Sequence, residues 1–167
     1  MPLSADLRVI LSATQTGSND FGGPVFAPLF DKAIALGSGT NANQSDIVFS
    51  DIRSLAASGT EDLDLAGVLI DAFGAVINAV EIVAVLIYAD PANTNDVVVG
   101  AAAQPVPLFG GTAGTIAVRP GGTFLIAAPN AAGQFAVGAG ATDRLRITNS
   151  GPGTPVTYQV HILGRSA

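Results

Sequence analysis

Residues 114–164 read GTIAVRPGGTFLIAAPNAAGQFAVGAGATDRLRITNSGPGTPVTYQVHILG. In this stretch short runs of β-forming residues alternate with turns rich in Gly, Pro and Asn, at a spacing of roughly 8–12 residues. The runs lie at 116–118, 123–128, 134–137, 143–148 and 156–163. Short strands at even spacing are typical of antiparallel sandwiches and barrels. The sequence therefore predicts an all-β protein with two packed sheets of about four strands each.

Composition narrows the class of protein. The 167 residues suffice for one domain with its own core, and the absence of cysteine excludes disulfides and thiolate metal sites. Only 12% of residues are charged, 49% are apolar, and the formal net charge is −6. Soluble domains usually carry about a quarter charged residues, so we expect another protein to cover much of this surface. The seven Lys and Arg are scattered, which argues against a nucleic-acid partner.

Residues 65–89 form an apolar segment of about the length of a membrane-spanning helix. Asp71 and Glu81 interrupt the segment, and no basic residues flank it to set an orientation. We interpret it instead as a turn or a short helical turn around 71–74, followed by a long buried strand over 81–88. This interpretation predicts no membrane partner.

The N-terminal part differs from the rest of the chain in composition and in the elements it predicts. We expect a strand over 6–14, followed by a loop rich in Gly, Ser, Asn and Pro over 16–28. A short helix or strand is expected over 29–36, and a polar loop over 37–45. We therefore divide the chain into an N-terminal arm, residues 1–45, and a β-sandwich domain, residues 46–167. The arm is either ordered only against a partner or a flexible surface loop.

Several apolar residues of this arm would be poorly covered on an isolated segment. A partner surface is the natural place for them, so the predicted partner interface is Val25, Phe26, Leu29, Phe30 and Ile34. Near Met1, Asp6 and Arg8 stand where the apolar core of a secretory signal would begin, which favours a protein made and used in a cytoplasm.

The predicted strands also define a core. Its members are the apolar residues on the inward faces, namely Val83, Val85, Ile87, Ile116, Val118, Phe124, Ile126, Val137, Leu145, Ile147, Val160 and Ile162. Helix is expected only as one or two short pieces, within 28–36 or 67–73.

The residue types that carry catalysis are scarce. His161 is the single histidine, and strand alternation places it opposite Tyr158, Val160 and Ile162, as a surface or interface side chain. No serine occurs in a G-x-S-x-G context. We therefore predict no catalytic residue, no cofactor and no enzymatic activity.

Carboxylates cluster in two places. Alternation places Asp62 and Asp64 on one face of a strand and Glu61 on the other. Residues 90–96, DPANTND, form an oxygen-rich loop that suits either a calcium ion or an ordinary Asx-containing turn. The loop lacks the Gly and the distant Glu of the helix–loop–helix calcium pattern, so no metal ligand is predicted, and calcium at 90–96 stays an open alternative.

A resemblance to a known class of protein covers roughly residue 50 to the end. The stretches that carry it are SDIRSLAASGTEDLDLAG at 50–67, DAFG at 71–74, NDVVVG at 95–100, VRPGG at 118–122, DRLRITN at 143–149 and TYQVHILG at 157–164. Together they resemble small proteins encoded in the structural gene blocks of tailed bacteriophages. Within that class the chain is similar in size and strand content to capsid decoration, or cement, proteins.

The resemblance implies a jelly-roll-like antiparallel β-sandwich, to which residues 1–45, outside the likeness, add the extended N-terminal arm. It implies a non-enzymatic protein of the phage head surface, assembled in the host cytoplasm, that binds the lattice of the major capsid protein. Closed symmetry favours a homo-oligomer, a dimer or a trimer. Two alternatives stay open, a spike, head-fibre or tail subunit and a lectin-like carbohydrate-binding sandwich, although the chain lacks the Trp of a typical sugar platform.

Overall fold

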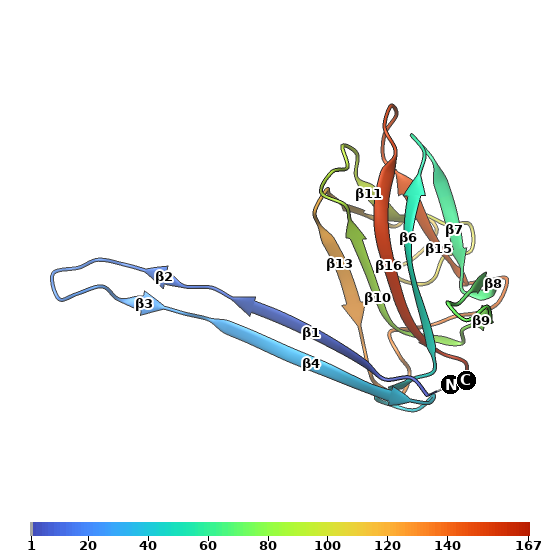
Figure 1. Cartoon of the computed structure of the whole chain (residues 1–167), viewed down its shortest axis with the longest axis horizontal. Coiled ribbons are helices and arrows are strands. Elements are labelled where there is room, and N and C mark those ends of the chain that lie inside the picture. Colours follow the sequence, from blue (N-terminus) through green and yellow to red (C-terminus); the bar gives the residue numbers. More distant parts are fainter. Residues whose placement is uncertain (1) are drawn as a thin grey trace.

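Alternation of apolar and polar residues along the chain produces two antiparallel sheets, which enclose a common apolar core in the computed structural model of residues 2–167 (Figure 1). The arm-side sheet, named for the arm that meets its outer face, has the order β13 (Thr123–Ala127), β10 (Glu81–Ala89), β16 (Val156–Arg165) and β6 (Ile47–Leu55), with β14 (Phe135–Ala136) also paired to β10. The far sheet has the order β12 (Thr115–Val118), β11 (Val97–Gly100), β15 (Arg144–Asn149) and β7 (Thr60–Asp64).

The eight main strands are paired in a nested way. β11 pairs with β12, β10 with β13, β7 with β15, and β6 with β16, all antiparallel, so each pair encloses the previous one in the sequence. Successive pairs alternate between the two sheets: β11–β12 and β7–β15 lie in the far sheet, and β10–β13 and β6–β16 in the arm-side sheet. The fold is thus an antiparallel β-sandwich with about four strands in each sheet, as the sequence predicts.

The core lies between the inward faces of the two sheets. Of the twelve predicted core residues nine are buried, and Phe124 and Ile126 are half-buried against the same cluster. The prediction for Ile116 is wrong, because its side chain is 37% exposed. Ile116 is on the inward face, opposite Val99, but β12 is the last strand of its sheet and one side of the residue stays open.

Residues 65–89 fold into strands. β8 (Ala66–Ile70) and β9 (Val76–Asn78) form a hairpin whose turn is held by Asp71, and β10 then runs through the core. Six of its nine residues are buried and the other three are half-buried, with Ile82, Val85 and Ile87 completely buried. The buried strand predicted at 81–88 is confirmed. No helix of the described residues is long and apolar enough to cross a membrane.

The expectation of one or two short helices is wrong for residues 2–167, all of whose regular elements are strands. Residues 29–36 belong to β4 (Leu29–Ser38), which pairs with β1 (Ala5–Ser12) over eight consecutive register positions. These cross-strand hydrogen bonds decide the conformation of a segment whose local sequence allowed either structure. Residues 67–70 are drawn into β8 by pairing with β9.

β1 and β4 form a long hairpin that extends away from the sandwich (Figure 1). The hairpin continues through β2 (Gln15–Thr16) and β3 (Val25–Phe26) to a turn closed by a bridge between Asn19 and Gly22. At its base, β5 (Gln44–Ser45) runs parallel to the end of β4 and leads into β6. This hairpin is the extended N-terminal arm.

Candidate binding surfaces on the arm and the sandwich

The two faces of the arm differ in chemistry because side chains alternate along β1 and β4. One face, here called the apolar arm face, carries the register pairs Leu7 with Ile34, Val9 with Lys32, and Leu11 with Phe30. The opposite face carries the ion pair between Arg8 and Asp31 together with Asp6, Ile10, Ala33 and Ala35. Lys32 is the only charged residue of the apolar arm face.

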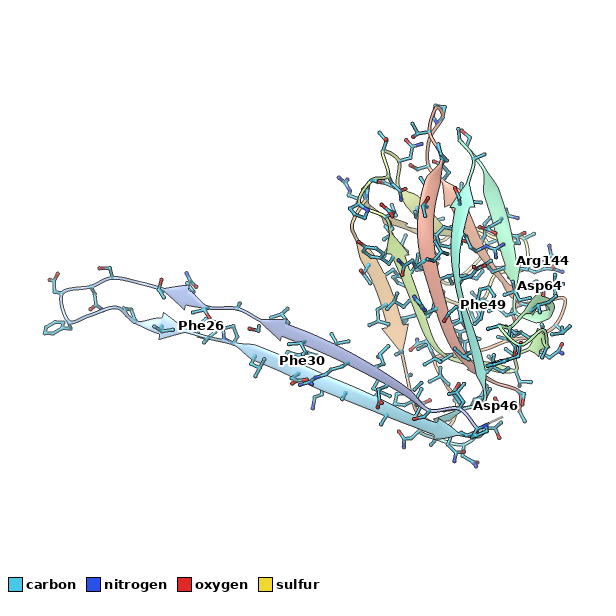
Figure 2. All side chains as sticks on the ribbon, viewed as in Figure 1. Phe26, Phe30, Asp46, Phe49, Asp64 and Arg144 are labelled. Carbon is cyan, nitrogen blue, oxygen red and sulfur yellow. The ribbon has the colours of Figure 1, made fainter. Side chains whose placement is uncertain are left out.

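The outer half of the arm leaves large apolar side chains in water. Leu11 is 60% exposed and Phe30 50%, and toward the tip Val25 and Phe26 are 64% and 66% exposed. Phe26 and Phe30 lie on the arm away from the sandwich, whereas Phe49 lies within it (Figure 2). An exposed row of this kind makes the arm a candidate interaction surface.

The structure distributes the five predicted interface residues along the arm. Val25 and Phe26 lie near the tip, Leu29 and Phe30 at the outer end of β4, and Ile34 near the base, where it is half-buried. Sequence reasoning missed Phe21, which is fully exposed in the turn at the tip. A phenylalanine inside the polar run SNDFGG was the signal that could have found it.

A buried arginine fixes the base of the arm to the sandwich. Arg165, with no exposed surface, donates to the carbonyl oxygens of Gln44 and Ala131 and pairs with Glu81 at 2.9 Å. Ser45, also fully buried, donates from its hydroxyl to the carbonyl oxygen of Gly164. Buried polar groups with satisfied hydrogen bonds hold one geometry, so the direction in which the arm leaves the sandwich is defined by these contacts. The predicted division after residue 45 falls at this anchor.

Two open grooves lie where the arm meets the arm-side sheet. One, of about 470 Å³, is lined by Leu7, Val9, Phe30 and Ile34 of the arm and by Leu125 among the residues of β13. The other, of about 420 Å³, lies between β1 and the outer face of β6, β10 and β16. The apolar arm face therefore looks toward the outer face of the arm-side sheet.

The outer face of the arm-side sheet carries no Asp, Glu, Lys or Arg apart from the anchor pair, Arg165 and Glu81. Strand register places its side chains in four rows. They are Ala127, Ala84, Leu163 and Val48; Leu125, Leu86, His161 and Ser50; Thr123, Tyr88, Gln159 and Ile52; and Thr157 with Ser54. We call this surface the uncharged sheet face. His161 lies in it, exposed, with Nδ1 3.0 Å from the hydroxyl of Ser50.

The outer face of the far sheet is charged instead. Arg146 binds Asp62 through two hydrogen bonds of 2.7 and 2.9 Å, and Arg144 lies 3.7 Å from the same carboxylate. The hydrogen bond from Arg146 lowers the pKa of Asp62 below its ordinary value, and the same bond raises the pKa of Arg146. Such pairs are compatible with permanent contact with water.

Glu61 lies on the opposite face of β7 from Asp62, as alternation predicts. It accepts a hydrogen bond from the hydroxyl of the buried Tyr158 at 2.6 Å and pairs with Arg53 at 2.6 Å. Burial, followed by the hydrogen bond to Glu61, raises the pKa of Tyr158, and the hydrogen bond that Arg53 donates to Glu61 raises the pKa of Arg53. The contacts join β7 of the far sheet to β6 and β16 of the arm-side sheet, which indicates a structural role.

The oxygen-rich loop at 90–96 is held as a turn. Asp90 accepts from the backbone N–H of Ala92, and the Asn93 side chain bonds both backbone groups of Thr157. Asn95 donates to the side-chain oxygen of Asn149. Over residues 2–167 no group of three or more His, Cys, Asp or Glu side chains is arranged to hold a metal ion.

Comparison of the chain with protein-family models, with curated proteins and with solved structures found no match.

Proposed function

We propose that this protein is a decoration, or cement, protein of a tailed-bacteriophage head, which binds the lattice of the major capsid protein and stabilises the shell without catalysis. The observation that carries the proposal is the arm: a defined hairpin that leaves the sandwich with its apolar side chains uncovered. A protein that folds around its own core and still exposes such a row needs a second surface to cover it.

The length of the arm suits a bridging role. At about 3.3 Å per extended residue, the chain from Ala5 to the turn after Asp20 reaches about 50 Å. Phe21, Val25 and Phe26 are thereby placed far from the sandwich, at a distance comparable to the width of a protein subunit. Many such contacts on a lattice sum by multivalency, so that a modest affinity for each site gives stable coverage.

The sandwich supports the same proposal. The nested strand pairing is the arrangement expected of a jelly roll, which the resemblance to phage structural proteins implies. Jelly rolls with two packed sheets are used in viral capsids, and also in lectins. The uncharged sheet face adds a second surface suited to protein contact. A sugar-binding face usually exposes aromatic rings, and the Phe, Tyr and Trp of this face are limited to Tyr88, which is half-buried.

The test is co-sedimentation of the purified protein with phage heads, with phage tails and with immobilised glycans. We expect binding to heads alone, and we expect Phe21→Ser with Phe26→Ser at the arm tip to weaken it at least about tenfold, since a few buried aromatic anchors dominate interface energetics. Phe73→Ser is the matched control, because Phe73 is 71% exposed in the β8–β9 turn, off the arm.

Heads that carry the protein should release DNA at a higher temperature than heads without it, because a ligand that binds only the assembled shell stabilises that state by mass action. Binding to tails alone would replace the proposal with the spike or tail alternative. Binding to glycans alone would replace it with the lectin alternative.

A further inference from the structure

The isolated chain exposes more surface than a compact monomer of its mass. Its accessible surface is 8890 Å². The scaling of folded monomers gives about 7,600 Å² for 16.6 kDa, so the excess is about 1,300 Å². A stable protein interface removes about 800 Å² from each partner. The excess accessible surface therefore equals the area that one chain loses in one standard interface and part of a second.

Two parts of this surface match each other in chemistry. The apolar arm face presents Leu7, Val9, Leu11 and Phe30 with one charge, and the uncharged sheet face presents no charged side chain apart from the anchor pair, Arg165 and Glu81. Surface ion pairs lie elsewhere: Arg8 with Asp31 on the opposite face of the arm, and Arg146 with Asp62 on the outer face of the far sheet. The apolar arm face and the uncharged sheet face are thus the two surfaces suited to losing contact with water.

The two surfaces do not cover each other within one chain. They diverge from the base of the arm, where the anchor fixes the angle, so the grooves between them stay open. Leu11 is 60% exposed on the arm and Ile52 is 68% exposed on the uncharged sheet face. A second copy brings the missing half of each contact, because each chain carries both surfaces.

We propose that copies of this chain exchange arms, with the apolar face of one arm lying across the uncharged sheet face of another copy. The lengths agree, since β1 and β4 have 8 and 10 residues and β10 and β16 have 9 and 10. The exchange covers both surfaces in every copy and leaves the ion-paired faces in water. It closes as a dimer or a trimer by symmetry.

Arm exchange divides the arm between two partners. β1 and β4 are covered by the other copy, while Phe21, Val25 and Phe26, beyond the end of β1, extend past its sheet and stay available for the shell protein. The inference goes beyond the proposed function and does not depend on it, because the oligomer forms without a capsid.

The first experiment measures the mass of the full-length protein against concentration by sedimentation equilibrium, with no phage component present. We expect a dimer or trimer, and we expect Leu11→Ser to raise its dissociation constant at least about tenfold. Ile10→Ser is the matched control, because Ile10 immediately precedes Leu11, is 56% exposed and lies on the opposite face of the arm. Both substitutions lie outside the core, so both variants keep the fold.

The second experiment uses the absence of cysteine in the chain. Leu11→Cys protein is mixed with a differently tagged Gln159→Cys protein under mild oxidation, and the mixture should form disulfide-linked pairs between the two variants. Ile10→Cys mixed with Gln159→Cys should form far fewer. Cross-linking that is equal in the two mixtures, or a monomer at every concentration, would overturn arm exchange. A monomeric protein whose Leu11→Ser variant loses binding to heads would assign the apolar arm face to the shell protein instead.

Discussion

The sandwich and the arm are made of the same kind of antiparallel strand, but only the sandwich covers its own apolar side chains. In β16 the inward residues Tyr158, Val160 and Ile162 are all buried. In β1 alternation produces an apolar face just as regular, yet Val9 and Leu11 are exposed because no second sheet packs on them. The difference shows that alternation defines a face, and that only a packing partner makes the face a core.

Truncating side chains in the two regions should give the largest contrast. Ile147→Ala removes a completely buried side chain from the far sheet and should lower the free energy of unfolding by about 2–5 kcal/mol. Leu11→Ala on the arm should change the free energy of unfolding by no more than about 0.5 kcal/mol, as is usual for surface substitutions. Urea titration of both variants, at a protein concentration low enough that the chain is monomeric, measures the contrast. Equal losses would mean that the arm folds back onto a core of its own chain.

The anchor between the two regions gives the next largest effect. Arg165→Met leaves the Gln44 and Ala131 carbonyl oxygens without their donor and should cost about 2 kcal/mol. It should also speed amide hydrogen exchange in β5, because β5 loses its attachment to the sandwich. Arg8→Met, which breaks only the exposed ion pair of the arm, serves as the control and should change neither the unfolding midpoint nor exchange in β5.

The charged outer face of the far sheet should produce a small dependence of stability on pH. Because Arg146 lowers the pKa of Asp62 in the folded protein, the pair stabilises the fold when Asp62 is ionised. This contribution is complete above the ordinary carboxyl pKa of about 4 and is lost as the pH falls through the lower folded value. At pH 7, Asp62→Asn should cost at most about 1 kcal/mol. The cost should shrink toward zero in acid, whereas Asp20→Asn at the arm tip should have no cost at either pH.

The strands of the sandwich were predictable because their signals are local. The Pro-Gly turn after Val118 and the alternation around His161 locate β12, β13 and β16 without knowledge of their partners. The core prediction fails for Ile116 because the sequence shows which way a side chain points but not whether its strand lies at the edge of a sheet. The local sequence of 29–36 is compatible with a helix or a strand for a similar reason, since its decisive partner, β1, is separated from it by residues 13–28.

The surfaces proposed for binding could be predicted only in part. The apolar residues of the arm stood out against a polar background, and five of them were assigned to a partner interface from sequence. The Arg165 anchor could not be found in this way, because its bond to Gln44 joins residues 121 positions apart. The uncharged sheet face was hidden as well, since it is assembled from alternate residues of four strands that are not consecutive in the sequence.

The most direct test of the account replaces residues 8–33 with Asn-Gly, which joins the register partners Leu7 and Ile34 by a two-residue turn and keeps the Arg165 anchor. The measurement is the unfolding midpoint of this shortened protein, compared with that of the full chain at a concentration where both are monomeric, together with its co-sedimentation with phage heads. The account predicts an unchanged midpoint and no binding to heads. A shortened protein that cannot fold, or one that folds and binds heads as well as the full chain, would contradict it.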